Sequence, residues 1–207
     1  MSTAEIVQGS PEWHAIRLGK VTASRVADLM AKTKTGWGAS RKNYMAELIA
    51  ERLTGVAADS YTNSAMQWGI DTEPHARAAY EFFGWASVQT VGFVGHPKIM
   101  MAGASPDGLV GPEGLVEIKC PNTATHIDTL LAKEVPSKYI PQMQFQMACS
   151  GRGWCDFVSF DPRMPERLRL FVKRVPRDPA YIAEMETAVV EFLAELDATI
   201  KALEAVA

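Results

Sequence analysis

The most informative part of the sequence is residues 105–120, which read SPDGLVGPEGLVEIKC. Their final part, residues 116–120, combines apolar side chains with two charges and predicts a strand. Because side chains alternate across a strand, Glu117 and Lys119 are expected on one face and Ile118 on the other. The sequence therefore predicts a strand that carries a carboxylate and an ammonium group side by side.

A second carboxylate precedes this strand in a Pro-Asp-Gly turn at residues 106–108. The turn follows the apolar run 99–102, and Pro and Gly at these positions favour a reversal of the chain. We therefore expect a hairpin that brings Asp107 close to Glu117 and Lys119. Carboxylates are the oxygen ligands that Mg²⁺ prefers, and a neighbouring lysine can orient or deprotonate a water molecule. The combination is typical of metal-dependent phosphodiester cleavage.

Each part of this pattern also has an ordinary structural explanation. A Pro-Asp-Gly turn is a common connection, and a Glu-x-Lys pair on an exposed strand is common surface chemistry. The apolar neighbours of the two charges favour the functional interpretation, because a buried charge is costly unless it is paired. These neighbours are Leu115, Val116, Ile118 and Cys120.

The composition is that of a globular protein with an ordinary core. The chain has 207 residues, of which 47% are hydrophobic, enough for one sizeable domain. No apolar run reaches the length of a membrane span, and the N-terminus lacks a secretory pattern, so no membrane association is expected. The 3 cysteines lack metal-ligand spacing and indicate a reducing compartment.

The net charge of −3 excludes a protein that coats nucleic acid through a uniformly basic surface. Positive charge is instead concentrated locally, and the acidic residues gather in the last part of the chain after residue 183. This segregation permits contact with DNA. The basic stretches are residues 17–20, 32–34, 41–42 and 163–177.

The order of predicted elements indicates a mixed α/β (α+β) fold with a central mixed β-sheet flanked by helices. We expect a single domain over residues 1–207, with an irregular arm over 1–12 and a C-terminal helix over 179–205. Apolar periodicity and stop signals such as Gly55 and Gly84 set the other boundaries. Helices are predicted over about 22–31, 40–53, 64–83 and 137–149, and strands over 87–94, 98–104, 114–120, 153–160 and 167–175.

Two further groups of residues support the site. Arg17, followed by the hydroxyl of Ser24 at a predicted helix start, can form an anion pocket, since guanidinium binds phosphate bidentately and a helix start supplies free N–H groups. An exposed arginine and a simple helix cap are the alternative. Glu73 lies in a predicted helix that could place another carboxylate over the site. Pro74 directly after it indicates a kink or a helix start.

Three alternating glutamines in the predicted helix 137–149 cannot all lie on one face. At least one is expected to turn inward, where its amide needs a partner such as a phosphate oxygen or a backbone group. The turn at residues 160–164 carries an arginine that could touch a DNA backbone, although a solvated turn is the simpler interpretation. The glutamines are Gln142, Gln144 and Gln146.

Taken together, these motifs resemble the lambda-type phage exonucleases, also called the YqaJ-like viral recombinases, of the PD-(D/E)XK nuclease superfamily. The resemblance extends from Trp13 to about Met164. Its motifs are specific in combination rather than singly. They are WHxxRLGxxTAS at 13–24, WGxxxE at 68–73, SPDGL at 105–109, EIKCP at 117–121, QxQ at 142–144 and DPRM at 161–164.

The resemblance implies a restriction-endonuclease-like core and a 5′→3′ exonuclease that degrades one strand of linear duplex DNA to mononucleotides. A 3′ single-stranded tail would remain for recombination by strand annealing. By the family pattern, Mg²⁺ would be bound by Asp107, Glu117 and the Ile118 carbonyl. Lys119 would position the attacking water, and Glu73 would support the site or a second ion. Mn²⁺ is expected to substitute.

The resemblance also implies a pocket for the 5′-terminal phosphate and a set of partners. The family forms a ring-shaped homotrimer around DNA, works processively with a single-strand annealing recombinase, and belongs to phages or prophages in the cytoplasm of a bacterial host. Met66 stands where the family has an apolar wedge, usually leucine, that parts the strands. The phosphate pocket would consist of Arg17, Ser24, Ser105 and Gln142.

Two other functions remain possible from the residues alone. A restriction-type endonuclease or junction resolvase would use the same carboxylates, but it would not need the pocket at Arg17 and Ser24. A non-catalytic DNA-end binding module would not need an intact catalytic set, yet Asp107, Glu117 and Lys119 are all present. Cleavage of a covalently closed circle would indicate an endonuclease rather than an exonuclease. Release of nucleotides would exclude a binding module without catalytic activity.

Overall fold

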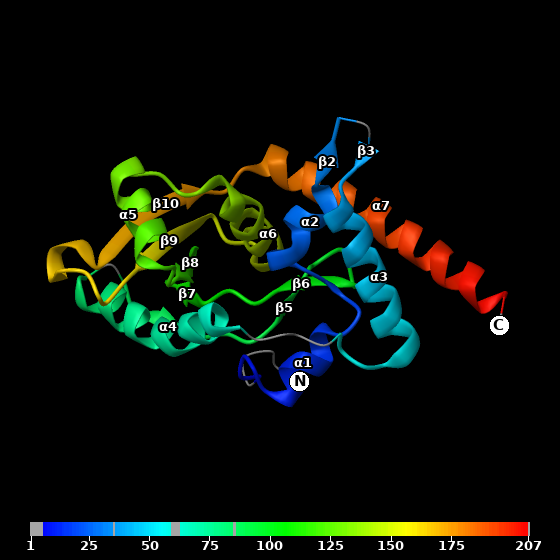
Figure 1. Ribbon diagram of the computed structural model, residues 1–207, viewed down its shortest axis with the longest axis horizontal. Helices are drawn as coiled ribbons and strands as arrows, with labels where there is room; N and C mark the ends of the chain where they lie inside the picture. The colour runs from blue at the N-terminus through cyan, green and yellow to red at the C-terminus, as the bar shows by residue number, and fades with distance from the viewer. Residues whose placement is uncertain (1–5, 35, 59–62, 85, 207) are drawn as a thin grey trace.

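The computed structural model describes residues 6–34, 36–58, 63–84 and 86–206 (Figure 1). Short 3₁₀ turns cover Ala23–Arg25 (η2), Ser137–Tyr139 (η3) and Glu166–Leu168 (η4). The helices are α1 (Pro11–Arg17), α2 (Val26–Met30), α3 (Ala39–Thr54), α4 (Ser64–Phe82), α5 (Thr123–Ala132), α6 (Ile140–Ser150) and α7 (Pro179–Glu204). The strands are β1 (Val21–Thr22), β2 (Lys32–Thr33), β3 (Gly36–Trp37), β4 (Val88–Gln89), β5 (Val94–Gly95), β6 (Ala102–Ala104), β7 (Gly108–Val110), β8 (Gly114–Lys119), β9 (Trp154–Phe160) and β10 (Leu170–Pro176).

The main sheet has the strand order β10-β9-β8-β7-β4. Strands β8 and β9 are parallel, and every other neighbouring pair in this sheet is antiparallel. Helix α4 covers one face, and α5 and α6 lie on the other (Figure 1). The expected mixed sheet flanked by helices is therefore confirmed.

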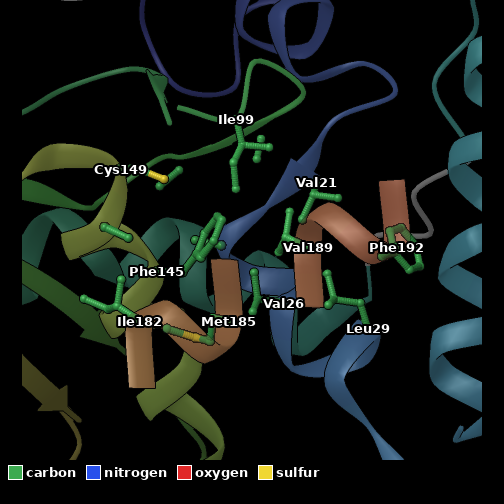
Figure 2. Close-up of a cluster of buried hydrophobic side chains, with 14 of the residues drawn as sticks. Val21, Val26, Leu29, Ile99, Phe145, Cys149, Ile182, Met185, Val189 and Phe192 are labelled. Carbon is green, nitrogen blue, oxygen red and sulfur yellow. The ribbon is translucent and has the colours of Figure 1, made fainter. Parts of the chain in front are cut away.

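Two apolar cores hold these layers together. The larger core lies where α6 and α7 meet the N-terminal helices α2 and α3, and Figure 2 shows Phe145, Met185 and Val26 interleaved there. The smaller core lies under α4, where Tyr80 packs against Val116 and neighbouring side chains of the main sheet. Strand β8 contributes to both, because its alternate side chains point to opposite faces.

A separate three-stranded sheet, β1-β6-β5, connects the N-terminal region to this frame. Strand β1 runs parallel to β6, with Val21 opposite Ala102. Strand β6 ends at Ala104, directly before the segment that carries Asp107. The residues after β1 are thereby held beside the start of the predicted site.

The predicted hairpin at residues 106–108 is wrong in one respect. The reversal before β8 occurs at residues 111–113, where Gly111 has a positive φ of 54°, and β7 pairs with β8 across it. Asp107 lies at the entrance of β7 rather than in the turn between the strands. The apolar run before it ends in β6, which belongs to the other sheet. Glycine tolerates the left-handed conformation that the true turn needs.

Other boundaries differ where local patterns were ambiguous. The strands expected over 87–94 and 98–104 are shorter and are divided between the two sheets. The strand expected from residue 167 begins at Leu170, because η4 precedes it. The alternation of apolar and polar residues predicts that a strand is present, but it does not show at which residue the hydrogen-bonded pairing with a neighbouring strand ends. The helices expected over 40–53, 64–83, 137–149 and 179–205 are confirmed within a few residues.

The irregular arm expected over residues 1–12 is shorter than predicted. Ser10 caps α1 by accepting a hydrogen bond from the Trp13 N–H at 3.2 Å, and Pro11 begins the helix. Proline suits a first helical position because its missing N–H would have no partner there. Residues 1–5 of this arm lie outside the described part of the chain.

Helix α4 passes through Pro74 and neither begins nor ends there. The Asn63 side chain caps its start by accepting from the Met66 N–H at 2.9 Å. Proline costs the helix one hydrogen bond, which packing against the sheet can offset. Within the described residues, none of the helices is both long and apolar enough to cross a membrane.

Candidate active site

Glu117 is the centre of the site, in the middle of β8 and fully buried. Its two carboxylate oxygens each accept a hydrogen bond at 2.6 Å from α6, Oε1 from Gln142 Nε2 and Oε2 from Gln146 Nε2. Lys119 Nζ lies 2.5 Å from Glu117 Oε1. The shared strand face predicted for Glu117 and Lys119 is therefore confirmed, and it faces α6.

Asp107 lies beside the same strand. Its Oδ2 accepts a hydrogen bond of 2.6 Å from the Ile118 backbone N–H. The carboxylate thus takes the place of a strand partner where the β7–β8 ladder ends. Burial raises the pKa of Asp107 well above its usual value, repulsion from Glu117 raises it further, and Lys119 offsets only part of this.

Glu73 approaches from α4 and forms an ion pair with Arg77 one turn later. Burial raises the pKa of Glu73; attraction to Arg77 opposes the shift, and repulsion from Glu117 adds to it. The three carboxylates of Glu73, Asp107 and Glu117 therefore share one electrostatic environment. This mutual repulsion supports the prediction that the three carboxylates belong to one site.

Lys119 is the cation of this group. Burial lowers its pKa, but attraction to Glu117 and Asp107 outweighs burial and raises the pKa above its usual value. These two carboxylates therefore favour the ammonium form of Lys119, which can orient a water molecule. Its Nζ also lies 5.2 Å from the centroid of the Tyr139 ring.

The donor set fits a hard divalent cation. Asp107 and Glu73 have raised pKa values because negative charge is crowded and desolvated, and a cation would relieve this. The donors are oxygen atoms, which Mg²⁺ and Mn²⁺ accept, and Mg²⁺ usually keeps several waters. Across the described ranges, no three His, Cys, Asp or Glu side chains are arranged to hold a metal by themselves. Waters or backbone oxygens would have to complete the coordination.

The second predicted group, around Arg17, is partly assembled. Arg17 Nη1 donates to Ser105 Oγ at 3.2 Å, and its guanidinium carbon lies 3.8 Å from the centroid of the Trp13 ring. Trp13 Nε1 also donates to Ser105 Oγ, at 2.9 Å. Because Ser105 is two residues from Asp107, this group lies next to the carboxylates along the chain. Burial lowers the pKa of Arg17, with Tyr44 and Glu51 opposing the shift.

The other predicted members of the phosphate pocket lie differently. Ser24 is exposed in η2, and its Oγ is 3.4 Å from Thr22 Oγ1. Gln142 donates to Glu117 rather than to the Arg17 group. Met66 is 49% exposed on the first turn of α4, as a side chain that meets DNA would need to be.

Two residues at the site were missed as site members by sequence reasoning. Gln146 holds one oxygen of Glu117 and is fully buried. Trp13 holds both Arg17 and Ser105. The signal was present in each case, because Gln142 and Gln146, like Trp13 and Arg17, are four residues apart and share a helix face.

Comparisons with known proteins identify the family and the fold of the chain. The YqaJ-like viral recombinase domain matches residues 12–153. The crystal structure of an alkaline exonuclease, LHK-Exo from Laribacter hongkongensis, is similar at 56% identity and a TM-score of 0.88, over 94% of this chain and 96% of that chain. LHK-Exo in complex with dAMP matches at 56% identity over the same shares with a TM-score of 0.89. No curated protein matches the chain in sequence.

A phage-related exonuclease from Haemophilus somnus 129PT shares the fold at a TM-score of 0.72 and 18% identity, over 89% of this chain and 96% of that chain. The chain therefore has the mixed α/β architecture of these nucleases, and its 56% identity to LHK-Exo assigns it to the exonuclease class. The chain belongs to the YqaJ-like viral recombinase family.

Proposed function

We propose that this protein is a Mg²⁺-dependent 5′→3′ exonuclease that degrades one strand of linear double-stranded DNA and leaves a 3′ single-stranded tail. The observation that carries the proposal is the buried Glu117 carboxylate, held by Gln142 and Gln146 and paired with Lys119. A buried charge held this firmly needs a function or a partner. The dAMP in the LHK-Exo complex supports a mononucleotide product.

The residues divide the work by their charge and position. Asp107 and Glu117, with the Ile118 carbonyl, would hold Mg²⁺, and Glu73 would support the site or a second ion. When bound, the ion would lower the pKa of a water molecule and neutralise negative charge on the phosphate. Lys119 would orient the attacking water and, in its ammonium form, stabilise charge that develops on the phosphate.

Recognition of a 5′ end is assigned to the group around Arg17. Its guanidinium is oriented by Trp13 and Ser105 before any ligand arrives, and such a fork binds a phosphate bidentately. Ser24, exposed in η2, would supply a hydroxyl to the phosphate, and the assignment of Gln142 to this pocket is weakened by its hydrogen bond to Glu117. Met66, exposed on α4, would part the strands.

The assembly belongs to the same proposal. A homotrimeric ring around the DNA would give processivity without a uniformly basic surface, which fits the net charge of −3. The partner would be a single-strand annealing recombinase in the cytoplasm of a bacterial host. The family of viral recombinases supports this assignment.

Digestion of linear duplex DNA with either 5′-phosphate or 5′-hydroxyl ends, with and without Mg²⁺, tests the function. We expect Mg²⁺-dependent release of mononucleotides, faster from 5′-phosphate ends. Mn²⁺ should replace Mg²⁺. Nicking or linearisation of covalently closed circles would favour an endonuclease instead. Binding to DNA ends that persists in EDTA, without release of nucleotides, would favour a binding module.

A further inference from the structure

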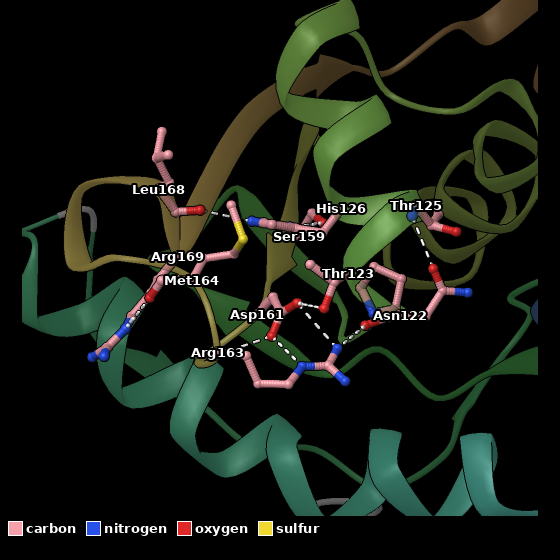
Figure 3. A network of polar contacts seen from close by, with 11 residues as sticks. Asn122, Thr123, Thr125, His126, Ser159, Asp161, Arg163, Met164, Leu168 and Arg169 are labelled. Carbon is pink, nitrogen blue, oxygen red and sulfur yellow. Dashed lines mark hydrogen bonds and ion pairs between the residues drawn. The ribbon is translucent and has the colours of Figure 1, made fainter.

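The turn after β9 carries an ion pair that the proposed function does not use. Asp161 is fully buried, and Arg163 grips it with two parallel hydrogen bonds, Nε to Oδ1 at 2.7 Å and Nη2 to Oδ2 at 3.0 Å (Figure 3). Thr123 Oγ1 donates to Asp161 Oδ2 at 2.7 Å. The guanidinium is therefore fixed in place, although the side chain is 47% exposed.

Arg163 contacts two segments that carry groups of the active site. Its Nη2 donates to the Pro121 carbonyl at 3.3 Å, two residues beyond Lys119. Its guanidinium carbon lies 4.5 Å from the centroid of the Trp68 ring, which is on α4, the helix of Glu73. Arg163 thus bridges the end of β8 and α4.

The Trp68 contact depends on the face of the ring. The indole Nε1 is buried, and no hydrogen-bond partner for it exists among the described residues. Arg163 therefore contacts the ring through its face, and the indole N–H forms no hydrogen bond that would hold the ring. A cation over an aromatic face contributes attraction without any hydrogen bond.

We propose that Arg163 is a positioning residue for nuclease activity, and that Asp161, Arg163 and Trp68 together form a clamp. The clamp fixes α4 against the end of β8 and so sets the position of Glu73 relative to Lys119. Arg163 acts through the Pro121 carbonyl and the Trp68 ring rather than on the substrate. The inference rests on the proposed function, in which Glu73 and Lys119 belong to the metal site.

The chain contains a matched control for this clamp. Arg174 grips the fully buried Asp156 in the same way, with Nε to Oδ1 at 2.8 Å and Nη2 to Oδ2 at 3.0 Å. Its guanidinium carbon lies 3.4 Å from the centroid of the Trp154 ring, and the side chain is 52% exposed. Trp154 pairs with Gly114, at the end of β8 opposite Lys119.

The decisive experiment compares Arg163→Lys with Arg174→Lys. Lysine keeps the charge but loses the bidentate fork and the flat stacking surface. Three quantities are measured for each variant and the wild type: Mn²⁺ affinity without DNA by calorimetric titration, kcat and KM on 5′-phosphorylated duplex, and hydrogen exchange of residues 64–73. Thermal unfolding gives the loss of stability in each.

We expect Arg163→Lys to weaken Mn²⁺ binding several-fold and to lower kcat by about tenfold or more with little change in KM, because small displacements of a site are costly. Exchange over residues 64–73 should accelerate. Arg174→Lys should lower stability by a similar amount and leave metal affinity, kcat and that exchange unchanged. Equal effects of the two variants on all readouts would overturn the clamp.

Substitutions of Trp68 give a second route if Arg163→Lys folds poorly. Trp68→Phe keeps an aromatic face and removes an unpartnered donor, so it should retain most of the metal affinity. Trp68→Leu should reproduce Arg163→Lys, and wild-type affinity in Trp68→Leu would contradict the proposal. If wild-type protein releases no nucleotides with Mg²⁺, the proposed function fails. Hydrogen exchange over residues 64–73 still decides whether the clamp holds α4.

Discussion

Two buried carboxylates on neighbouring strands of the main sheet are satisfied in different ways. Asp156 on β9 lies opposite Val116 and accepts hydrogen bonds from Tyr80 Oη of α4 and from Arg174 of the neighbouring strand β10. Glu117, one register position further along β8, points toward α6 and the glutamines. Both are fully buried.

The difference lies in the charges around each carboxylate. The charge of Asp156 is neutralised by the guanidinium of Arg174, and the two side chains form an ordinary structural ion pair. Glu117 has one ammonium partner but also Asp107 and Glu73 nearby, whose pKa values burial and repulsion raise. An arrangement that leaves excess negative charge is poor for stability and well suited to a cation. The comparison indicates that one region stabilises the fold and the other serves function.

The largest expected effect is the loss of nuclease activity when Lys119, the ammonium partner of Glu117, is removed. Lys119→Ala should reduce nucleotide release by about a thousandfold, since a positioned group that assists proton or charge transfer contributes on that order. Binding of duplex DNA should remain, as measured by fluorescence anisotropy in Ca²⁺. Lys173→Ala, which removes a surface ion pair with Glu134, is the control and should keep full activity. Substantial turnover by Lys119→Ala would remove lysine from the mechanism.

The comparison predicts opposite profiles for neutral amides at the two carboxylates. Glu117→Gln should lose Mg²⁺-dependent cleavage and Mn²⁺ binding, because a carboxylate ligand is gone. Asp156→Asn should keep activity but lower the free energy of unfolding by about 2 kcal/mol, because Arg174 loses its charged partner. Urea unfolding and nucleotide release measure both. A Glu117→Gln variant that is destabilised more than Asp156→Asn would contradict the division of roles.

A smaller effect is expected at the predicted phosphate pocket. Arg17→Ala should reduce the preference for 5′-phosphate over 5′-hydroxyl ends by about tenfold, the worth of one charge-assisted contact. Digestion of matched duplexes that differ only at the 5′ end gives this ratio. Arg152, which donates to the backbone carbonyls of Gly111 and Gly114, provides a control substitution. An unchanged ratio in Arg17→Ala would refute the pocket.

The smallest expected effect concerns the contribution of Asp161 to the free energy of unfolding at acidic pH. Burial raises the pKa of Asp161, but hydrogen bonds from Arg163 and Thr123 outweigh burial and hold the pKa at about 2. The pKa of an aspartate in an unfolded chain is about 3.9. Ionised Asp161 therefore stabilises the fold above that pH, and this contribution is lost as the pH falls toward 2. Asp161→Asn should therefore flatten the loss of stability over this window. Urea unfolding at several pH values below 5 measures it; an unchanged slope would show that Asp161 is not held ionised.

Much of the site could be predicted because its signals are local. Strand alternation placed Glu117 and Lys119 on one face, and the glutamines required inward partners. The turn was misplaced because Pro-Asp-Gly and Gly-Pro-Glu both favour reversal, and only pairing of β7 with β8 decides between them. The clamp could not be predicted, since Trp68, Pro121 and Arg163 are far apart in sequence and their contact depends on packing.

The chemical groups of the site, and the strand face that carries them, follow from the amino-acid sequence alone, because side-chain type and strand period are local properties. The family also follows from the sequence, through motifs that are specific in combination. Three features became visible only in the folded chain: Gln142 and Gln146 hold Glu117, Asp107 ends the β7–β8 ladder, and Glu73 approaches from α4. Those facts depend on long-range packing of helices on the sheet, which burial of two apolar cores stabilises.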